Sequence, residues 1–254
     1  MDPNARKEMG NIVDHEVSAS LARVSAATDR LLATSVTLTD VQVCEPSLLP
    51  GWTRGHVLSH IARNADGLGN LLRWADTGTQ MPMYASAQAR EADIEAGAGR
   101  DAAELAADVR DSAAAFAERA ATLPAGAWMV PVRALRGGLF PAYGILERRL
   151  SELEIHHVDL AAGYAPGDWP EDFVTECLPR VADSFSGRPD TPPCLIWADG
   201  SGHEYRIGPL EPGTAPVIIH GPDRDLLAWL LGRRGGTGLR IEPGSALPAL
   251  PAWR

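Results

Sequence analysis

A helical repeat of apolar residues returns four times in the first 162 residues, and it constrains the fold more than any other feature of the chain. In each segment apolar side chains recur at steps of three and four residues, so one face of the expected helix is apolar and the other polar. The four segments cover residues 11–35, 53–76, 101–123 and 141–161. Four long amphipathic helices, with a long crossover at residues 124–139 before the last, predict a four-helix bundle.

The ends of these segments carry helix signals. Thr53 is a typical N-cap, and Trp52 before it is the hydrophobic residue that often accompanies such a cap. Pro141 suits the first turn of the fourth helix, and Gly163 suits the position just after its end. Residues 86–96 also predict a short polar helix.

The chain changes character after residue 163. Residues 165–170 have the composition of a linker, and the helix candidates beyond it, 171–186 and 223–234, alternate with short strand candidates. We expect those strands at residues 194–197, 204–207, 215–220 and 239–241, with the first two joined as a hairpin. The predicted fold is therefore multidomain: a four-helix bundle over residues 1–163 and a small α+β domain over residues 170–254.

Charge and cysteine content exclude several classes of function. The formal net charge is −10, so the chain has no basic surplus for a nucleic-acid backbone. The three cysteines, which we expect to be buried packing residues, are widely spaced and form no CxxC motif, which suits a reducing compartment and argues against disulfides or a thiolate metal site. We find no signal peptide and no apolar run long enough to cross a bilayer, so we expect a cytoplasmic protein that does not bind membranes.

A candidate metal site begins with Glu152 and His156 in the fourth helical segment. The two residues are four apart, so they stack on one face, at the border of the apolar side. A carboxylate and an imidazole one turn apart can hold a metal ion, although an ordinary Glu–His contact has the same spacing. Glu154 and His157 form a competing pair, but this pair points further round the helix.

The second helical segment offers the remaining ligand. His56 and His60 are one turn apart, and His60 lies nearer the apolar stripe, so His60 is the better placed of the two. Two histidines and one glutamate from two helices, with a fourth position left open, form the pattern of a catalytic zinc site.

These residues also carry a resemblance. The stretches LPGWTRGHVLSH (residues 49–60) and ELEIHHVDL (residues 152–160) together resemble the mycothiol-dependent maleylpyruvate isomerase family, which belongs to the DinB-like four-helix-bundle metalloenzymes. The resemblance covers essentially the whole chain. In that family zinc is held by the second histidine of GHxxxH and by the first glutamate and first histidine of ExExHH. Matched residue by residue, these ligands are His60, Glu152 and His156.

The resemblance implies a reaction and its partners. Zinc would bind the thiol of mycothiol and deprotonate it, and the thiolate would add to the double bond of maleylpyruvate. Rotation about the new single bond and elimination of the thiol would give fumarylpyruvate. The expected partners are therefore an anionic unsaturated keto acid and a low-molecular-weight thiol, with the α+β domain contributing to their pocket. We expect a monomer or a weak homodimer.

Arginines are the expected anchors for the two carboxylates of such a substrate. The family is thought to use an arginine of the C-terminal domain, and the match in Gly232-Arg233-Arg234 is Arg233. Arg149, one turn before Glu152, is a second candidate. The ordinary interpretation of Arg233 and Arg234 is that of solvated cations at a helix end.

Two other functions remain open at the level of the sequence. A mycothiol S-transferase would use the same metal and thiol, and would join the thiol to another electrophile without the elimination step. A bundle with a vestigial metal site would serve as a binding or regulatory module and would bind no zinc.

Overall fold

The computed structural model describes residues 3–135, 137–209, 213, 216–242, 244 and 246–253, with side chains from residue 15 onward. The chain separates into two compact units, Met1–Ala162 and Gly163–Arg254. The described residues are mostly helical with small sheets. No helix among them is long and apolar enough to span a membrane.

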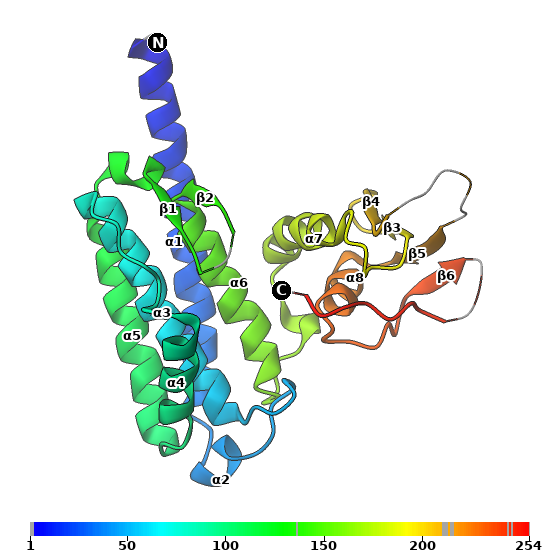
Figure 1. The fold of residues 1–254 in the computed structure, drawn as a ribbon, viewed down its shortest axis with the longest axis horizontal. Helices are drawn as coiled ribbons and strands as arrows, with labels where there is room; N and C mark the ends of the chain where they lie inside the picture. The colour runs from blue at the N-terminus through cyan, green and yellow to red at the C-terminus, as the bar shows by residue number, and fades with distance from the viewer. Residues whose placement is uncertain are drawn as a thin grey trace. The chain divides into compact units, whose positions relative to one another are not determined.

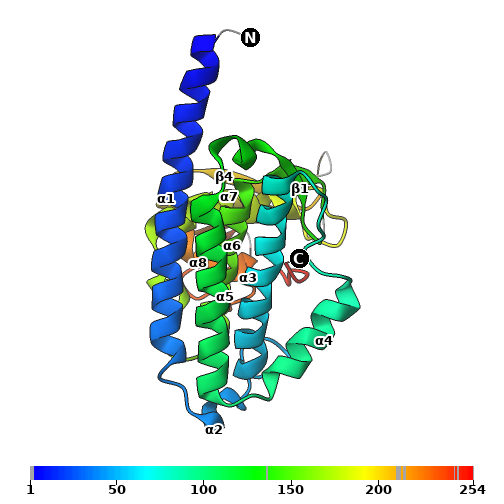
Figure 2. The same cartoon turned by 90° about the vertical axis from the view of Figure 1, so that its left-hand side faces the viewer.

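Four long helices build the first unit. They are α1 (Pro3–Ser35), α3 (Arg54–Thr77), α5 (Ala102–Thr122) and α6 (Gly144–Asp159). Both α1 and α3 pack against α5 and α6, as Figures 1 and 2 show. The apolar stripes of the sequence meet in the centre, where Leu31, Ile61, Leu105 and Ile145 are fully buried. This packing, rather than intrinsic helix propensity, supplies most of the stability of such amphipathic helices.

Shorter elements complete the first unit. Helix α2 (Asp40–Val43) precedes α3, and α4 (Ala87–Ala98) packs against α3. The predicted crossover contains a 3-10 helix, Ala125–Met129, and an antiparallel hairpin of β1 (Pro131–Arg133) and β2 (Leu139–Pro141).

The two ends of α6 differ from the prediction. Pro141 pairs with Pro131 at the end of the hairpin, and α6 begins only at Gly144. At the other end Ala161, rather than Gly163, is the first residue with a left-handed backbone (φ 49°). The reason lies in α3: Arg54 donates from Nε to the carbonyl of Leu160 (2.6 Å) and from Nη2 to that of Ala161 (3.1 Å). A side chain distant in sequence therefore ends this helix.

The second unit combines two helices with one four-stranded sheet. Helices α7 (Glu171–Phe185) and α8 (Asp223–Leu230) pack against each other and against the sheet. The strands are β3 (Cys194–Ala198), β4 (Glu204–Ile207), β5 (Val217–Gly221) and β6 (Arg240–Glu242), in the order β4-β3-β5-β6. The predicted β3–β4 hairpin is confirmed, while β3 and β5 run parallel. Residue 215, where the third strand was expected to begin, lies outside the described residues.

Two smaller predictions in the chain were wrong. Helix α8 ends at Leu230 instead of continuing to residue 234, because Gly232 adopts a left-handed backbone (φ 72°). Of the three cysteines, Cys177 and Cys194 are buried, but Cys44 is exposed in the connection after α2. All three are free thiols.

Candidate metal centre

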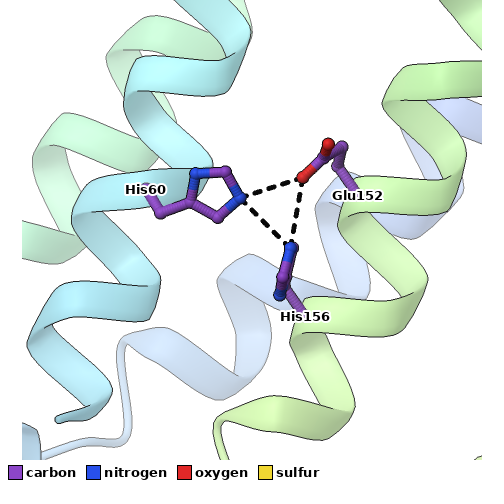
Figure 3. Close-up of side chains that lie close together, drawn as sticks. All are labelled: His60, Glu152 and His156. Carbon is purple, nitrogen blue, oxygen red and sulfur yellow. Dashed lines mark hydrogen bonds and ion pairs between the residues drawn. The ribbon is translucent and has the colours of Figure 1, made fainter. Parts of the chain in front are cut away.

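His60 of α3 meets Glu152 and His156 of α6 in the first unit, where His60 is buried and the other two side chains are half-buried (Figure 3). Nε2 of His60 lies 2.9 Å from Oε2 of Glu152 and 3.1 Å from Nε2 of His156. The third side of this triangle, from Nε2 of His156 to Oε2 of Glu152, is 3.2 Å. Within the described part of the chain, these three residues form the group that could hold a metal ion.

The motif at residues 49–60 holds α3 in the position that this meeting requires. Thr53 caps the helix by accepting a hydrogen bond from the backbone N–H of His56 (3.3 Å), so the helix begins six residues before His60. Gly55 lets the end of α4 approach: a Cβ there would lie 2.3 Å from the carbonyl oxygen of Ala98. Thr53 thus fixes where α3 begins, and Gly55 allows α4 to pack closely against it.

The three ligand atoms fit a tetrahedral ion. Two ligands bound to zinc at 2.0–2.1 Å are about 3.3 Å apart in a tetrahedral site, close to each side of the observed triangle. The donor set of two imidazole nitrogens and one carboxylate oxygen is one that zinc accepts, and it leaves one coordination position for another molecule. The residues present therefore fit a catalytic zinc ion.

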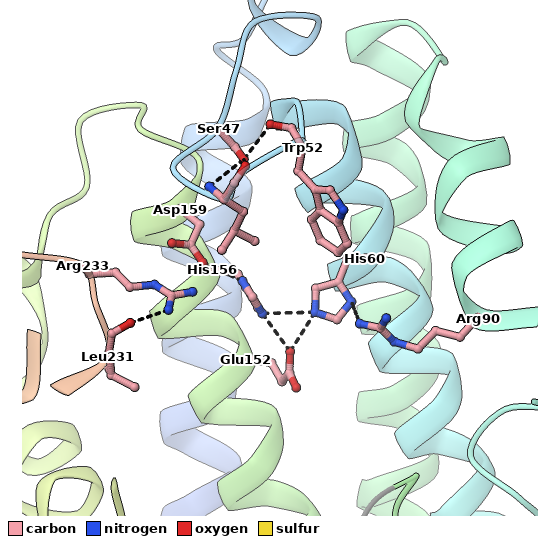
Figure 4. Close-up of polar contacts among 10 residues, drawn as sticks. Ser47, Trp52, His60, Arg90, Glu152, His156, Asp159, Leu231 and Arg233 are labelled. Atoms are coloured by element: carbon pink, nitrogen blue, oxygen red, sulfur yellow. Dashed lines mark hydrogen bonds and ion pairs between the residues drawn. The ribbon is translucent and has the colours of Figure 1, made fainter. Parts of the chain in front are cut away.

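Asp159 orients one of the ligands from the same helix. Its Oδ2 lies 2.8 Å from Nδ1 of His156, and the carboxylate is fully buried (Figure 4). This contact keeps the Nδ1 proton in place and turns Nε2 towards the other two ligands. Such a carboxylate behind a histidine also increases the basicity of the ring.

Arg90 of α4 contacts the other histidine. Its Nη2 donates to Nδ1 of His60 at 3.1 Å, and its guanidinium lies over the ring of Tyr84. Trp52, from the connection before α3, packs edge-on against His60 with ring centroids 5.6 Å apart. Both contacts are visible in Figure 4, on the side of His60 away from Glu152. They restrict the imidazole from two directions.

The electrostatics of the cluster concentrate one proton on one histidine. Burial lowers the pKa of His60 to about 4. Burial by itself also lowers the pKa of His156, but hydrogen bonds to Asp159 and Glu152 outweigh it and raise this pKa to about 9. Burial raises the pKa of Glu152, yet hydrogen bonds from the two histidines hold it well below its ordinary value. At neutral pH the metal-free cluster is therefore a carboxylate, a neutral imidazole and an imidazolium.

The competing candidates lie elsewhere in the first unit. Glu154 forms an ion pair with Arg30 of α1, and Nε2 of His157 lies 2.7 Å from Oγ1 of Thr34, which is also in α1. His56 packs at the N-terminus of α3, where its Nε2 lies 3.0 Å from a carboxylate oxygen of Glu95.

The two arginine candidates have different surroundings. Arg149 is fully buried in the first unit, and its Nη1 donates to the carbonyl of Ile61 and to Oδ1 of Asn64, both at 2.9 Å. Arg233 is half-buried in the turn after α8, where its Nη1 donates to the carbonyl of Leu231 at 2.6 Å. Its neighbour Arg234 forms an ion pair with Asp225.

Sequence reasoning missed two residues of the site. Asp159 is three residues after His156, so its place on the same side of the helix could have been inferred from that spacing. Arg90 gave no signal, because it lies in a polar helix whose packing depends on Gly55 and the loop before it.

Comparison with protein families assigns the chain. The model of the mycothiol maleylpyruvate isomerase N-terminal domain matches residues 24–161. The chain belongs to the mycothiol maleylpyruvate isomerase family. The model of the MDMPI C-terminal domain matches residues 168–252, so the two matches together extend across both units.

Solved structures of the family have the same fold. A crystal structure of the mycothiol-dependent maleylpyruvate isomerase is 28% identical, with a TM-score of 0.86 over 93% of this chain and 97% of that chain. A second crystal structure, of a mutant with one histidine replaced by alanine, is 27% identical with the same TM-score and coverage. None of the curated proteins matches the chain significantly.

Proposed function

We propose that this member of the family is a zinc- and mycothiol-dependent cis–trans isomerase that converts maleylpyruvate to fumarylpyruvate. The observation that carries the proposal is the triangle of His60, Glu152 and His156, whose sides of 2.9–3.2 Å match three corners of a tetrahedral zinc site. These three residues would hold the ion, in a DinB-like four-helix bundle formed by the long helices. The fourth corner would take the thiol.

The chemistry supplied by the two bound groups is that of a metal-held thiolate, which adds to an activated double bond and leaves again after rotation. The chain contributes the geometry. Asp159 fixes the ring of His156 with Nε2 facing inward, and Trp52 packs against the ring of His60. Glu152 brings one negative charge to the centre, so a zinc ion and a thiolate there would leave the local charge close to neutral.

Arg90 changes role when an ion binds. Nδ1 of His60 accepts a hydrogen bond from Arg90 in the structure. A metal ion on Nε2 would place the ring proton on Nδ1, and two donors would then face each other. We infer that Arg90 turns away on metal binding, which would leave a guanidinium beside the centre for an anionic substrate.

We propose Arg233 as the anchor for a substrate carboxylate, in preference to Arg149. Arg149 is fully buried and already holds two groups of α3, whereas Arg233 is half-buried in a turn. Arg233→Ala should raise KM for the substrate at least about tenfold, the loss typical of a charged hydrogen bond. Arg234→Ala is the matched control, because Arg234 already pairs with Asp225.

Turnover with a small amount of thiol tests the reaction. With maleylpyruvate in large excess over mycothiol, an isomerase consumes all the substrate and returns all the thiol. A mycothiol S-transferase, the alternative function, stops when the thiol is used up. If the amount of substrate lost equals the amount of thiol added, the protein is a transferase and the isomerase proposal is wrong.

Metal analysis tests the centre independently of the substrate. We expect about one zinc per chain in the parent and less than about a tenth of that in His60→Ala, because one of three ligands is lost. His56→Ala, one turn earlier on α3, should keep its zinc. Full zinc in His60→Ala, or none in the parent, would contradict the proposed ligand set; a zinc-free parent would favour a binding module.

A further inference from the structure

Arg149 of α6 links the two helices that carry the candidate metal ligands. Its side chain is fully buried, and Nη1 donates to the carbonyl oxygen of Ile61 and to Oδ1 of Asn64, both at 2.9 Å. Ile61 directly follows His60 in α3, and Asn64 is one turn after His60. The guanidinium therefore holds the backbone of α3 next to the residue that presents one of the ligands.

The ligands lie between this link and a second one, which Arg54 forms. In α6, Arg149 comes three residues before Glu152. The two carbonyls that accept from Arg54 come four and five residues after His156. In α3 the order is reversed, because Arg54 comes before His60 and the acceptors of Arg149 come after it. Two arginines thus join α3 and α6 on both sides of the metal centre.

Stability alone does not explain a charged side chain at this position. Nε and Nη2 of Arg149 are buried, and among the described residues they have no hydrogen-bond partner. Burial lowers the pKa of Arg149 to about 10, although nearby Glu152 opposes the shift. The ring of Phe116, with its centroid 6.0 Å from the guanidinium carbon, offsets only part of this cost. Apolar side chains of similar volume can often replace a buried ionic group without loss of stability.

We propose that Arg149 is a positioning residue: it holds α3 against α6 so that Nε2 of His60 meets the ligands of α6 at the spacing of a zinc site. This role rests on the zinc centre of the proposed function. The distances of 2.9 Å and 3.1 Å from Nε2 of His60 to the two ligands of α6 both cross the contact between the helices. A shift of either helix therefore changes both distances at once.

Arg149→Met removes the link and keeps an unbranched side chain in the core. We expect the affinity of the full-length protein for zinc to fall about tenfold or more, as it does when residues that hold metal ligands are changed. Loss of a cation would by itself favour binding of Zn²⁺, so weaker binding reports the placement of the ligands. Competition with a fluorescent chelator measures the affinity, and unchanged or tighter binding would overturn the proposal.

A double variant separates this role from stability. Arg149→Met alone deprives the buried amide of Asn64 of its donor. Asn64→Leu combined with Arg149→Met replaces both partners by apolar groups, a change that can be nearly neutral for stability. We expect the double variant to unfold at about the same urea concentration as the parent and still to bind zinc about tenfold or more weakly. Parental zinc affinity in the double variant would contradict the proposed role.

Cobalt(II) reports the geometry of the site in the chains that are folded. Its visible absorption bands are strongest in tetrahedral coordination, so they weaken when one ligand is displaced. At saturating cobalt we expect weaker bands in both variants than in the parent, and identical spectra would overturn the positioning role. A parent that binds neither zinc nor cobalt would overturn the ligand set itself, and the role of Arg149 with it.

Arg63→Met is the matched control. Arg63 is three residues after His60 in α3, but it joins this helix to α5, through an ion pair with Asp108 at 2.7 Å. We expect Arg63→Met to leave the zinc affinity within about twofold of the parent and the cobalt spectrum unchanged. If Arg63→Met weakens zinc binding as much as Arg149→Met does, any loss of helix packing has this effect, and the specific role of Arg149 is wrong.

Discussion

Helix α6 carries two glutamate–histidine pairs, and the structure uses them in opposite ways. Glu152 and His156 face α3 and meet a third metal-binding side chain, His60. Glu154 and His157 face α1, where Glu154 pairs with Arg30 and His157 lies beside the hydroxyl of Thr34. The residue types are the same in both pairs. The difference lies in what the neighbouring helix offers.

The comparison shows how a binding site differs from a structural contact. Glu154 and His157 are 1% and 2% exposed, and each meets a partner of complementary type, a cation or a hydroxyl. Such a pair has no need of an ion. At the other pair two imidazole nitrogens and a carboxylate oxygen lie within 2.9–3.2 Å of one another, an arrangement that could hold one ion.

The same substitution on both sides of α6 gives the largest expected difference. Glu152→Gln should weaken zinc binding by more than about a hundredfold, because a charged ligand is lost. Even residues that only hydrogen-bond to a metal ligand can change metal affinity by up to about a hundredfold. Glu154→Gln should leave the zinc affinity unchanged. Competition with a fluorescent chelator measures both values, and equal losses would remove the distinction between the two pairs.

Asp159→Asn should weaken zinc binding by about ten- to a hundredfold, through the orientation and basicity of His156. The amide keeps the size of the side chain but removes the charge next to Nδ1, 2.8 Å away. Arg90→Gln serves as a comparison, because it removes a donor that opposes coordination by His60, and should not weaken zinc binding. Unchanged affinity in Asp159→Asn would show that the buried carboxylate is not required to orient the ligand.

Zinc affinity should depend on pH through His156. The pKa of this group is raised to about 9, so it is protonated at pH 7 and must lose its proton before it can bind an ion. His60, with a pKa of about 4, is already neutral. We expect the affinity to rise about tenfold per pH unit between pH 7 and 9 and to level off above.

Calorimetry in buffers of different ionisation enthalpy counts the protons released. The same pKa shift predicts about one proton per zinc at pH 7. Zinc binding to Glu154→Gln should release the same number of protons, since Glu154 contacts α1 and lies outside the ligand cluster. Release of no proton would mean that His156 is neutral before the ion arrives.

The smallest expected effect is on stability. Glu154→Gln should lower the free energy of unfolding of the zinc-free protein by about 1–2 kcal/mol, because it weakens the bond to Arg30, whose 36% exposure lets water compensate part of the loss. Glu152→Gln should destabilise the zinc-free protein as well, because the Glu152 carboxylate accepts hydrogen bonds from both histidines, which hold its pKa well below its ordinary value. Urea unfolding of both variants and of the parent measures these losses.

The sequence predicts the parts of the fold that depend on periodicity. The long helices, the N-cap at Thr53 and the β3–β4 hairpin follow from local patterns and are confirmed. The ends of α6 and α8 do not follow from these patterns. Arg54, more than a hundred positions away in the sequence, contacts the end of α6, and the left-handed backbone of Gly232 follows the end of α8.

The candidate site divides in the same way. The i,i+4 relation of Glu152 and His156, and the position of His60 beside the apolar stripe, could be inferred from helical geometry. That Arg90 would reach His60 could not, because α4 is polar and its position is set by its packing against α3. The roles of the three residues as ligands and of Arg233 as an anchor stay predictions.

Arg54 has a mechanical consequence for the whole centre. It is the first residue of α3, six positions before His60, and it grips the last carbonyls beyond α6, four and five positions after His156. One guanidinium thus joins the start of α3 to the end of α6. Sliding one helix along the other would break these bonds before the spacing of the donor atoms changes.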